Sequence, residues 1–382
     1  MRIAILGGDG YLGWPAAMYF AARGDTVLAI DNYLRRRLAR ETGSEPLLPT
    51  PDLAARCARF EALTGKRIAH RIADCAEDGA LSAMFAEFRP DAAIHFAEQP
   101  SAPYSMRGRD EARLTLRNNV ATTFELIWAV KSAAPRCHIV KLGSMGEYGT
   151  PDIDIEEGWI EIAHKGRKDK FLYPRAGGSL YHTSKILDTD LLEFETRSGG
   201  LRATDLMQGP VYGHCSDEAR DDETLFPHFH YDDLFGTVIN RFAAQAACGI
   251  PLTVYGKGHQ RRGYLDLRDT LQCLRLAIDA PPAPGRLRVL NQFTEIFAVL
   301  ELAERVRGVG ARLGFDVTIR MLDNPRREQE EHYYRPAHDG LWKLGLEPHY
   351  LSDDRLAAMI EFVRRRRDAV DTSRILPRVS WA

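Results

Sequence analysis

The stretch Ile3-Ala4-Ile5-Leu6-Gly7-Gly8-Asp9-Gly10-Tyr11-Leu12-Gly13 decides the fold of this chain. Its apolar start predicts a buried strand, and the glycines of Gly7-x-x-Gly10-x-x-Gly13 follow directly. Glycine allows a tight turn and lets the backbone approach a bound pyrophosphate closely. Because a helical pattern begins at Leu12, the free N–H groups of a helix N-terminus would face that anion. The stretch therefore predicts a dinucleotide-binding strand–turn–helix unit.

Short apolar runs alternate with helical patterns through the first half of the chain. The runs predicted as buried strands are Ile3–Leu6, Val27–Ile30, Ile68–Ala73, Ala92–Phe96, Cys137–Leu142 and Ala203–Met207. The clearest helical patterns are Leu12–Ala22, Leu81–Phe88 and Val120–Ser132. Continuous apolar strands that alternate with helices are typical of a parallel sheet covered on both faces. We therefore expect an α/β fold with a Rossmann-type doubly wound parallel sheet.

The chain is long enough for two domains, at roughly 100–200 residues each. We expect residues 1–205 to form the dinucleotide-binding domain, with an insertion at residues 32–67 in which Leu53–Leu63 predicts a helix. Beyond residue 205, prolines and glycines interrupt short helical patterns. Residues 206–382 are expected to form mainly a smaller, mostly helical substrate-binding lobe, partly interleaved with the first domain.

The composition argues against several classes of protein. The 51 Lys and Arg residues face 53 Asp and Glu residues, so a net charge of −2 offers no basic field to nucleic acid. Six scattered cysteines without a CxxC pair predict no metal site. No leader-like segment and no apolar run of membrane-spanning length occur, so we expect a cytoplasmic protein without membrane insertion.

Acidic residues follow the second and third predicted strands. Asp31 ends the second strand, where a carboxylate can hold both ribose hydroxyls of an adenosine. This favours NAD over NADP, although Arg35 lies close by in the sequence. Asp74 is placed either to meet the adenine edge or to cap a helix. The residues expected to contact the cofactor are Gly7, Asp9, Gly10, Tyr11, Leu12, Gly13, Asp31, Asn32, Arg35, Asp74, Cys75, His95, Phe96, Tyr181, Lys185 and Gln208.

A tyrosine and a lysine four residues apart, Tyr181 and Lys185, begin another predicted helix. This spacing puts both side chains on one helical face. A tyrosine pKa of about 10 is too high for a base at neutral pH, and a neighbouring ammonium would lower it. Ser144 follows the fifth predicted strand, at the sheet edge where such folds bind ligands. Its hydroxyl can bridge a substrate hydroxyl and Tyr181.

These motifs together resemble the extended short-chain dehydrogenases of the NAD-dependent epimerase/dehydratase family, which act on nucleotide sugars. Longer segments make the resemblance more specific. They are Gly7–Tyr11, Ser101–Met106, Val140–Pro151, Ile153–Gly158, Pro251–Gly256, Asn291–Glu295 and Leu346–Leu351. On these segments the chain resembles one branch of the family, the UDP-sulfoquinovose synthases.

The resemblance implies an enzyme that converts UDP-glucose and sulfite to UDP-sulfoquinovose for sulfolipid biosynthesis, with bound NAD recycled. Tyr181 would take the proton of the 4-hydroxyl while hydride leaves carbon 4. The 4-ketone would allow water to leave across carbons 5 and 6, and sulfite would add to carbon 6. Sulfite would be free or delivered by a partner enzyme. The resemblance also implies a homodimer paired through Val120–Ser132 and Ser184–Thr196.

The groups that perform the elimination are left open. Related 4,6-dehydratases carry an Asp-Glu pair directly after the serine or threonine, where this chain has Met145 and Gly146. Glu147 is the nearest carboxylate, with a salt bridge or cap as its alternative role. His182 is placed to move a proton or help hold sulfite, with a structural role as the alternative. Asn119 matches the family's catalytic-helix asparagine, or else caps a helix.

The substrate-binding residues are implied in part by the same resemblance. Arg262 matches the position that clamps the diphosphate in extended family members, and Arg326 is a second candidate. The full expected set is Ser101, Met145, Gln208, Tyr255, Gln260, Arg262 and Arg326. Two other hypotheses remain at this point: a nucleotide-sugar 4-epimerase or dehydratase that does not use sulfite, and a non-catalytic NAD-binding protein.

Overall fold

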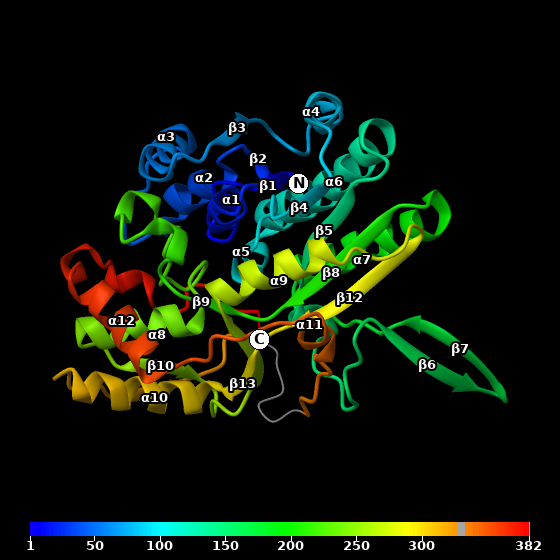
Figure 1. Ribbon diagram of the computed structural model, residues 1–382. Helices are drawn as coiled ribbons and strands as arrows, with labels where there is room; N and C mark the ends of the chain where they lie inside the picture. Colours follow the sequence, from blue (N-terminus) through cyan, green and yellow to red (C-terminus); the bar gives the residue numbers. More distant parts are fainter. Residues whose placement is uncertain (327–332, 382) are drawn as a thin grey trace.

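One large parallel sheet forms the centre of the computed structural model, which describes residues 1–326 and 333–381 (Figure 1). The strand order is β12-β8-β5-β4-β1-β2-β3, with every neighbouring pair parallel. The strands are β1 (Arg2–Leu6), β2 (Thr26–Asp31), β3 (Ile68–Ile72), β4 (Ala92–His95), β5 (His138–Ser144), β8 (Arg202–Gln208) and β12 (Arg286–Gln292). This confirms the expected doubly wound sheet, whose order reverses between β1 and β4, where such folds bind ligands.

Alternate side chains of each strand supply the cores on the two faces of the sheet. Ile3 and Ile5 pack in one cluster with Trp14, whereas Ala4 and Leu6 pack in the other with Phe85. Burial on both faces explains why the strands are continuous apolar runs in the sequence. The covering helices are α1 (Gly13–Ala22) and α9 (Leu267–Asp279) on the first face, and α4 (Ala80–Phe88), α6 (Arg109–Ala133) and α7 (Leu180–Gly199) on the second.

The insertion after β2 folds into α2 (Leu34–Thr42) and α3 (Leu53–Thr64). The second helix confirms the predicted Leu53–Leu63. Asp52 caps it, since its carboxylate accepts from the backbone N–H of Ala55 at 2.7 Å. Both helices send an arginine towards the glycine turn, so the insertion is fastened to the cofactor end of the sheet.

One helix differs from the sequence prediction, and a strand and a hairpin were not specified by it. The edge strand β12 comes from beyond residue 205, so the sheet takes a strand from the later part of the chain. Helix α6 begins at Arg109 and not near Val120. The sequence prediction missed its first turns because they are polar and show little apolar periodicity. An antiparallel hairpin, β6 (Trp159–His164) and β7 (Arg167–Leu172), projects from the body of the molecule (Figure 1).

The smaller lobe combines helices with short sheets and contributes one side of the ligand cavity. Its elements are β9 (Val211–Tyr212), α8 (Val238–Cys248), β10 (Leu252–Tyr255), β11 (Arg261–Asp266), β13 (Glu295–Ala298), α10 (Val299–Arg312), β14 (Ile319–Leu322), α11 (Asp339–Lys343) and α12 (Asp353–Arg364). The short helix α5 (Ala102–Ser105) follows β4 and packs against α6 and α7. Helix α8 packs against α10 and α12. Among the described helices, none is long and apolar enough to span a bilayer.

Candidate active site

A cavity of about 870 Å³ opens at the carboxyl ends of the parallel strands. The turn after β1, the ends of β2, β4, β5 and β8, and the first turn of α7 form one side. The smaller lobe forms the other side. Glycines, carboxylates, a tyrosine and several arginines therefore meet in one space, although they are spread over most of the chain.

Most of the predicted site residues line this cavity. They are Gly7, Gly10, Tyr11, Leu12, Gly13, Asp31, Asn32, Arg35, Asp74, Cys75, Phe96, Ser101, Ser144, Met145, Tyr181, His182, Lys185, Gln208, Tyr255, Gln260, Arg262 and Arg326. Four predicted residues are buried behind the lining instead: Asp9, His95, Asn119 and Glu147.

The glycine turn is packed so tightly that side chains would not fit. Gly7 has φ +82°, and a Cβ there would lie 2.7 Å from the carbonyl carbon of Phe96. A Cβ on Gly13 would lie 2.8 Å from the carbonyl carbon of Gly7. The start of α1 can therefore approach β1 and β4 closely, and the turn lines the cavity where a pyrophosphate would bind.

Two carboxylates beside the turn have different roles. Asp31 lines the cavity and accepts from the backbone N–H groups of Asp9 (2.9 Å) and Tyr33 (2.7 Å). Burial, together with the charge of Asp9, raises the pKa of Asp31 to about 6. Asp9 points away from the cavity, so its carboxylate, predicted to contact the cofactor, forms a structural ion cluster.

The Asp9 cluster joins three parts of the chain. Its carboxylate lies 2.7 Å from Nε of Arg36, 3.1 Å from Nε2 of His228, and pairs with the fully buried Arg56. Although burial opposes ionisation, hydrogen bonds from Arg36 and His228 hold the pKa of Asp9 far below its usual value. The insertion and the smaller lobe are thus both tied to the turn.

Asn119 and His95 support the cavity wall from behind. Asn119 lies within α6 and not at its start. Its side-chain oxygen accepts from the backbone N–H of Gln99 at 2.8 Å, and its side-chain nitrogen donates to the hydroxyl of Ser184 at 3.0 Å. His95 contacts Thr123 at 3.2 Å, and burial lowers the pKa of its imidazole well below the usual value. Their contacts hold α6 against the segment after β4 and the start of α7.

Tyr181 and Lys185 lie on one face of α7, with the Lys185 ammonium 5.9 Å from the centre of the Tyr181 ring. The ammonium also lies 2.7 Å from Oε1 of Glu98 and donates to the carbonyl of Leu142. Burial raises the pKa of Tyr181, and the charge of Glu98 raises it further. The predicted lowering of this pKa by Lys185 is therefore wrong, because burial, together with the charge of Glu98, outweighs the nearby positive charge.

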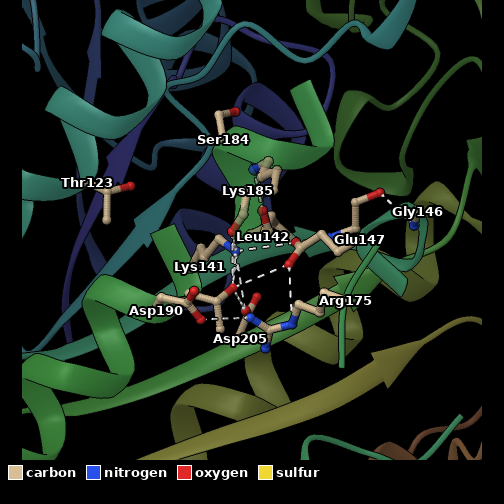
Figure 2. A network of polar contacts seen from close by, with 12 residues as sticks. Thr123, Lys141, Leu142, Gly146, Glu147, Arg175, Ser184, Lys185, Asp190 and Asp205 are labelled. Carbon is tan, nitrogen blue, oxygen red and sulfur yellow. Dashed lines mark hydrogen bonds and ion pairs between the residues drawn. The ribbon is translucent and has the colours of Figure 1, made fainter. Parts of the chain in front are cut away.

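Buried charges form a network under α7 (Figure 2). The Lys141 ammonium on β5 lies 3.2 Å from Asp205 and 3.4 Å from Glu147. It also donates to the carbonyl of Lys185 at 2.9 Å and to the hydroxyl of Thr189 at 2.7 Å. One buried ammonium therefore joins β5, β8 and α7. Removing one partner of such a buried pair costs about 3–5 kcal/mol.

Glu147 belongs to this network and does not reach the cavity. Its carboxylate is fully buried and accepts from the backbone N–H of Ser144 at 2.9 Å. The Ser144 hydroxyl in turn accepts from the backbone N–H of Gly146 at 3.1 Å. The geometry favours the salt-bridge and capping role of Glu147, which fixes Ser144 at the cavity edge.

His182 occupies the space beside Gly146. A Cβ at Gly146 would lie 2.7 Å from Cδ2 of His182, so no larger residue fits there without moving the ring. The other side of the imidazole is fixed, with Nδ1 3.0 Å from the Ser179 hydroxyl. Burial, with the charges of Arg326 and Arg262, lowers the pKa of His182 to about 3. A neutral imidazole can accept a proton but offers no positive charge to sulfite.

Three arginines gather on the lobe side of the cavity: Arg241, Arg262 and Arg326. Burial lowers the pKa of Arg262, and burial with the charges of the other two arginines lowers the pKa of Arg326 to about 10. Arg241 donates to the hydroxyl of Tyr255 at 3.0 Å. A group of like charges such as this is stabilised by an anion between them. The arrangement suits a diphosphate.

Comparisons with known proteins agree with this geometry. The profile of the NAD dependent epimerase/dehydratase family matches residues 3–291. The chain is 47% identical over 380 residues to the chloroplastic UDP-sulfoquinovose synthase of Spinacia oleracea, covering 100% of this chain and 79% of the relative. It is 43% identical over 384 residues to the UDP-sulfoquinovose synthase of Sulfolobus acidocaldarius, covering 100% and 98%.

The chain belongs to the UDP-sulfoquinovose synthases, a branch of the NAD dependent epimerase/dehydratase family. Solved structures confirm the fold of this synthase. The UDP-glucose 4-epimerase of Bifidobacterium longum in complex with NAD+ and UDP aligns with a TM-score of 0.71 at 19% identity, covering 96% of this chain and 99% of that one. The UDP-glucose-4-epimerase of Stenotrophomonas maltophila aligns with a TM-score of 0.73 at 19% identity, covering 97% and 100%.

The synthase is NAD-dependent, and its residues fit that cofactor. The cradle around Gly7 and Gly13 has no room for a Cβ, as close approach to a pyrophosphate requires. Asp31 lines the cavity at the end of β2, where an adenosine ribose would bind. Arg35 and Phe235 also line the cavity. They stack on each other, with the guanidinium carbon 3.3 Å from the centre of the ring.

Sequence reasoning missed three charged residues of this synthase. Glu98 lies three positions beyond the end of β4 and lines the cavity. An acidic residue just after an apolar strand could have indicated a site residue from the sequence. Arg241 lies within the buried helix α8, and its charge among apolar residues was a second signal. Lys141 lies inside the apolar run of β5, and only its position against β8 and α7 shows its role.

Replacing Tyr181 with Phe in this synthase removes the hydroxyl while the ring still fills its buried site. We expect kcat to fall by a factor of about 10²–10⁴, the usual contribution of a positioned proton-transfer group. Bound NAD should remain, since the cradle is untouched. Product formation and NAD released on denaturation would be measured, with the exposed Tyr350→Phe as control. Unchanged turnover would contradict the assignment.

Replacing Glu98 with Gln removes the negative charge beside Lys185. The charges that act on Tyr181 are those of Glu98, Glu147, Lys141 and Asp188, after burial. Because Glu98 raises the pKa of Tyr181, its loss should lower that pKa. The phenolate would then form at lower pH, so the acidic limb of the pH profile for cofactor reduction should move to lower pH. The exposed Glu87→Gln is the control, and a shift to higher pH would contradict the argument.

Proposed function

We propose that this enzyme converts UDP-glucose and sulfite to UDP-sulfoquinovose for the biosynthesis of sulfoquinovosyl diacylglycerol, with no net oxidation of bound NAD. One observation carries the proposal: the cavity combines Ser144, Tyr181 and Lys185 with an arginine group, but has Met145 and Gly146 where dehydratases carry acids. The relatives from Spinacia oleracea and Sulfolobus acidocaldarius support it over the full length of the chain.

The steps at carbon 4 use the pair on α7. Tyr181 takes the proton of the 4-hydroxyl and returns it at the end of the cycle, and Ser144 bridges the same oxygen. The Lys185 ammonium, on the next turn of α7, opposes the effect of burial and of Glu98 on the phenolate. Bound NAD supplies the hydride acceptor, and later the donor, for carbon 4. Since the same proton and hydride leave and return, one tyrosine serves both halves of the reaction.

The steps at carbons 5 and 6 follow from the 4-ketone, which acidifies the hydrogen on carbon 5. Loss of that proton and of the 6-hydroxyl releases water and leaves a double bond between carbons 5 and 6. The sulfur of sulfite then bonds to carbon 6, and carbon 5 regains a proton. We assign the proton transfer here to His182, which lines the cavity beside Gly146, and a positioning role to Glu147, which lies behind the lining.

The uridine diphosphate half of the substrate would lie along the smaller lobe. Arg241, Arg262 and Arg326 would hold the diphosphate, because bidentate guanidinium groups match phosphate oxygens. Tyr255 is fixed by Arg241 and by Gln260, whose amide donates to the Tyr255 carbonyl at 3.2 Å. This orientation would direct the sugar towards Tyr181.

A product analysis tests the proposal. Purified protein would be incubated with UDP-glucose, with and without free sulfite, and the nucleotide sugars identified by mass spectrometry. We expect a sulfonated nucleotide sugar that appears only with sulfite, which would also show that no sulfite-donating enzyme is required. UDP-galactose, or a 4-keto-6-deoxy sugar, as the main product would contradict the proposal and favour an epimerase or a dehydratase.

We also propose that the enzyme is a homodimer paired through α6 and α7. These helices pack side by side, with an ion pair of 2.9 Å between Lys131 and Glu195. Apolar side chains remain exposed on both: Phe124, Trp128, Leu187 and Phe194. Exposed apolar groups on neighbouring helices are typical of an interface. A cytoplasmic location stays a prediction, which cell fractionation would test.

Trp128→Glu tests the proposed interface. A charge buried between two copies is costly, so we expect the variant to be a monomer while the wild type is a dimer. Light scattering after size-exclusion chromatography gives the mass. Met321→Glu changes an exposed apolar residue elsewhere and should leave the mass unchanged. A Trp128→Glu protein that keeps the wild-type dimer mass would contradict the interface.

A further inference from the structure

The segment from Val370 to Trp381 runs from the insertion to the catalytic helix. Arg378 fastens its middle, because the guanidinium lies 2.6 Å from Asp233 and donates to the hydroxyl of Ser44 at 2.8 Å. Asp233 and Trp381 both line the cavity. This segment therefore contributes directly to the ligand site.

Trp381 joins two functional parts of the cavity. Its indole N–H donates to the carbonyl of Gly178 at 3.2 Å, directly before the Ser179 that caps the catalytic helix α7. Its backbone N–H donates to the carbonyl of Pro325 at 2.9 Å, and a β-bridge links Trp381 to Arg326. The Arg326 guanidinium carbon lies 5.5 Å from the centre of the indole ring.

The indole face compensates for repulsion at Arg326. Arg262 and Arg241 act on Arg326 as like charges, and a long, flexible side chain would turn away from them in the absence of ligand. The π face of a tryptophan attracts a guanidinium group and restricts its orientation. Since the ring is held at Gly178 and Pro325, it provides a fixed surface against which Arg326 can lie.

We propose that Trp381 is a positioning residue of the nucleotide-sugar site, which holds Arg326 in the orientation that binds the diphosphate. The inference rests on the proposed function, since it takes the ligand to be a nucleoside diphosphate sugar. Trp381 acts on substrate binding and not on the chemistry at carbon 4. Its loss therefore raises KM for UDP-glucose and leaves kcat close to that of the wild type.

Two substitutions separate the π face from the volume of the side chain. Trp381→Phe keeps an aromatic face, whereas Trp381→Leu keeps apolar volume without one. Titration calorimetry with UDP on the NAD-loaded protein should show binding weakened about tenfold in Trp381→Leu, or about 1.4 kcal/mol. Trp381→Phe should stay within about threefold of the wild type. The exposed Leu376→Ala, in the same segment and outside the lining, is the control and should bind UDP normally.

A double-mutant cycle tests whether Trp381 acts through Arg326. If it does, Arg326→Ala combined with Trp381→Leu should bind UDP no more weakly than Arg326→Ala alone. Fully additive losses, or equal affinities of the Trp381→Leu and Trp381→Phe proteins, would overturn the proposal. NAD content would be measured in every variant and should not change. A wild type that fails to bind UDP would refute the proposed function itself, whereas normal binding by Trp381→Leu would refute only this inference.

Discussion

The active site depends on one buried ammonium group, that of Lys141. It lies in the middle of a strand, where a charge is costly unless it is paired and fully hydrogen-bonded. Asp205, Glu147 and Thr189 provide that environment, and each comes from a different element. The same contacts fix the loop of Ser144 and the register of α7. Electrostatic compensation in the core thus sets the catalytic geometry at its surface.

The cofactor end follows the same physical rule. Asp9 is ionised in a buried position because Arg36, Arg56 and His228 surround it. Those three side chains come from the insertion and from the smaller lobe, so the glycine turn is stabilised by segments that are remote in sequence. The carboxylate is therefore part of the framework of the NAD site, and Asp31 beside it is the acid that faces the cavity.

The region around Gly146 accounts for the departure from the dehydratase pattern. With glycine at this position, the imidazole of His182 fills space that a glutamate side chain would otherwise need. Burial keeps that imidazole neutral, and Met145 and Gly146 supply no carboxylate, so this part of the cavity lacks the acid pair of the dehydratases. Such a site can allow elimination and still admit an external nucleophile, consistent with membership of the UDP-sulfoquinovose synthases.

The spacing of residues within short segments was sufficient to predict the strands, the glycine turn and Asp31 at the end of β2. It also predicted that Tyr181 and Lys185 share a helical face. Each of these depends on spacing along a single strand, turn or helix. The tertiary structure alone decided that Glu98 neutralises Lys185, that Glu147 lies behind the cavity, and that Trp381 meets Arg326. These outcomes depend on contacts between distant segments, since burial and neighbouring charge arise only when the chain is folded.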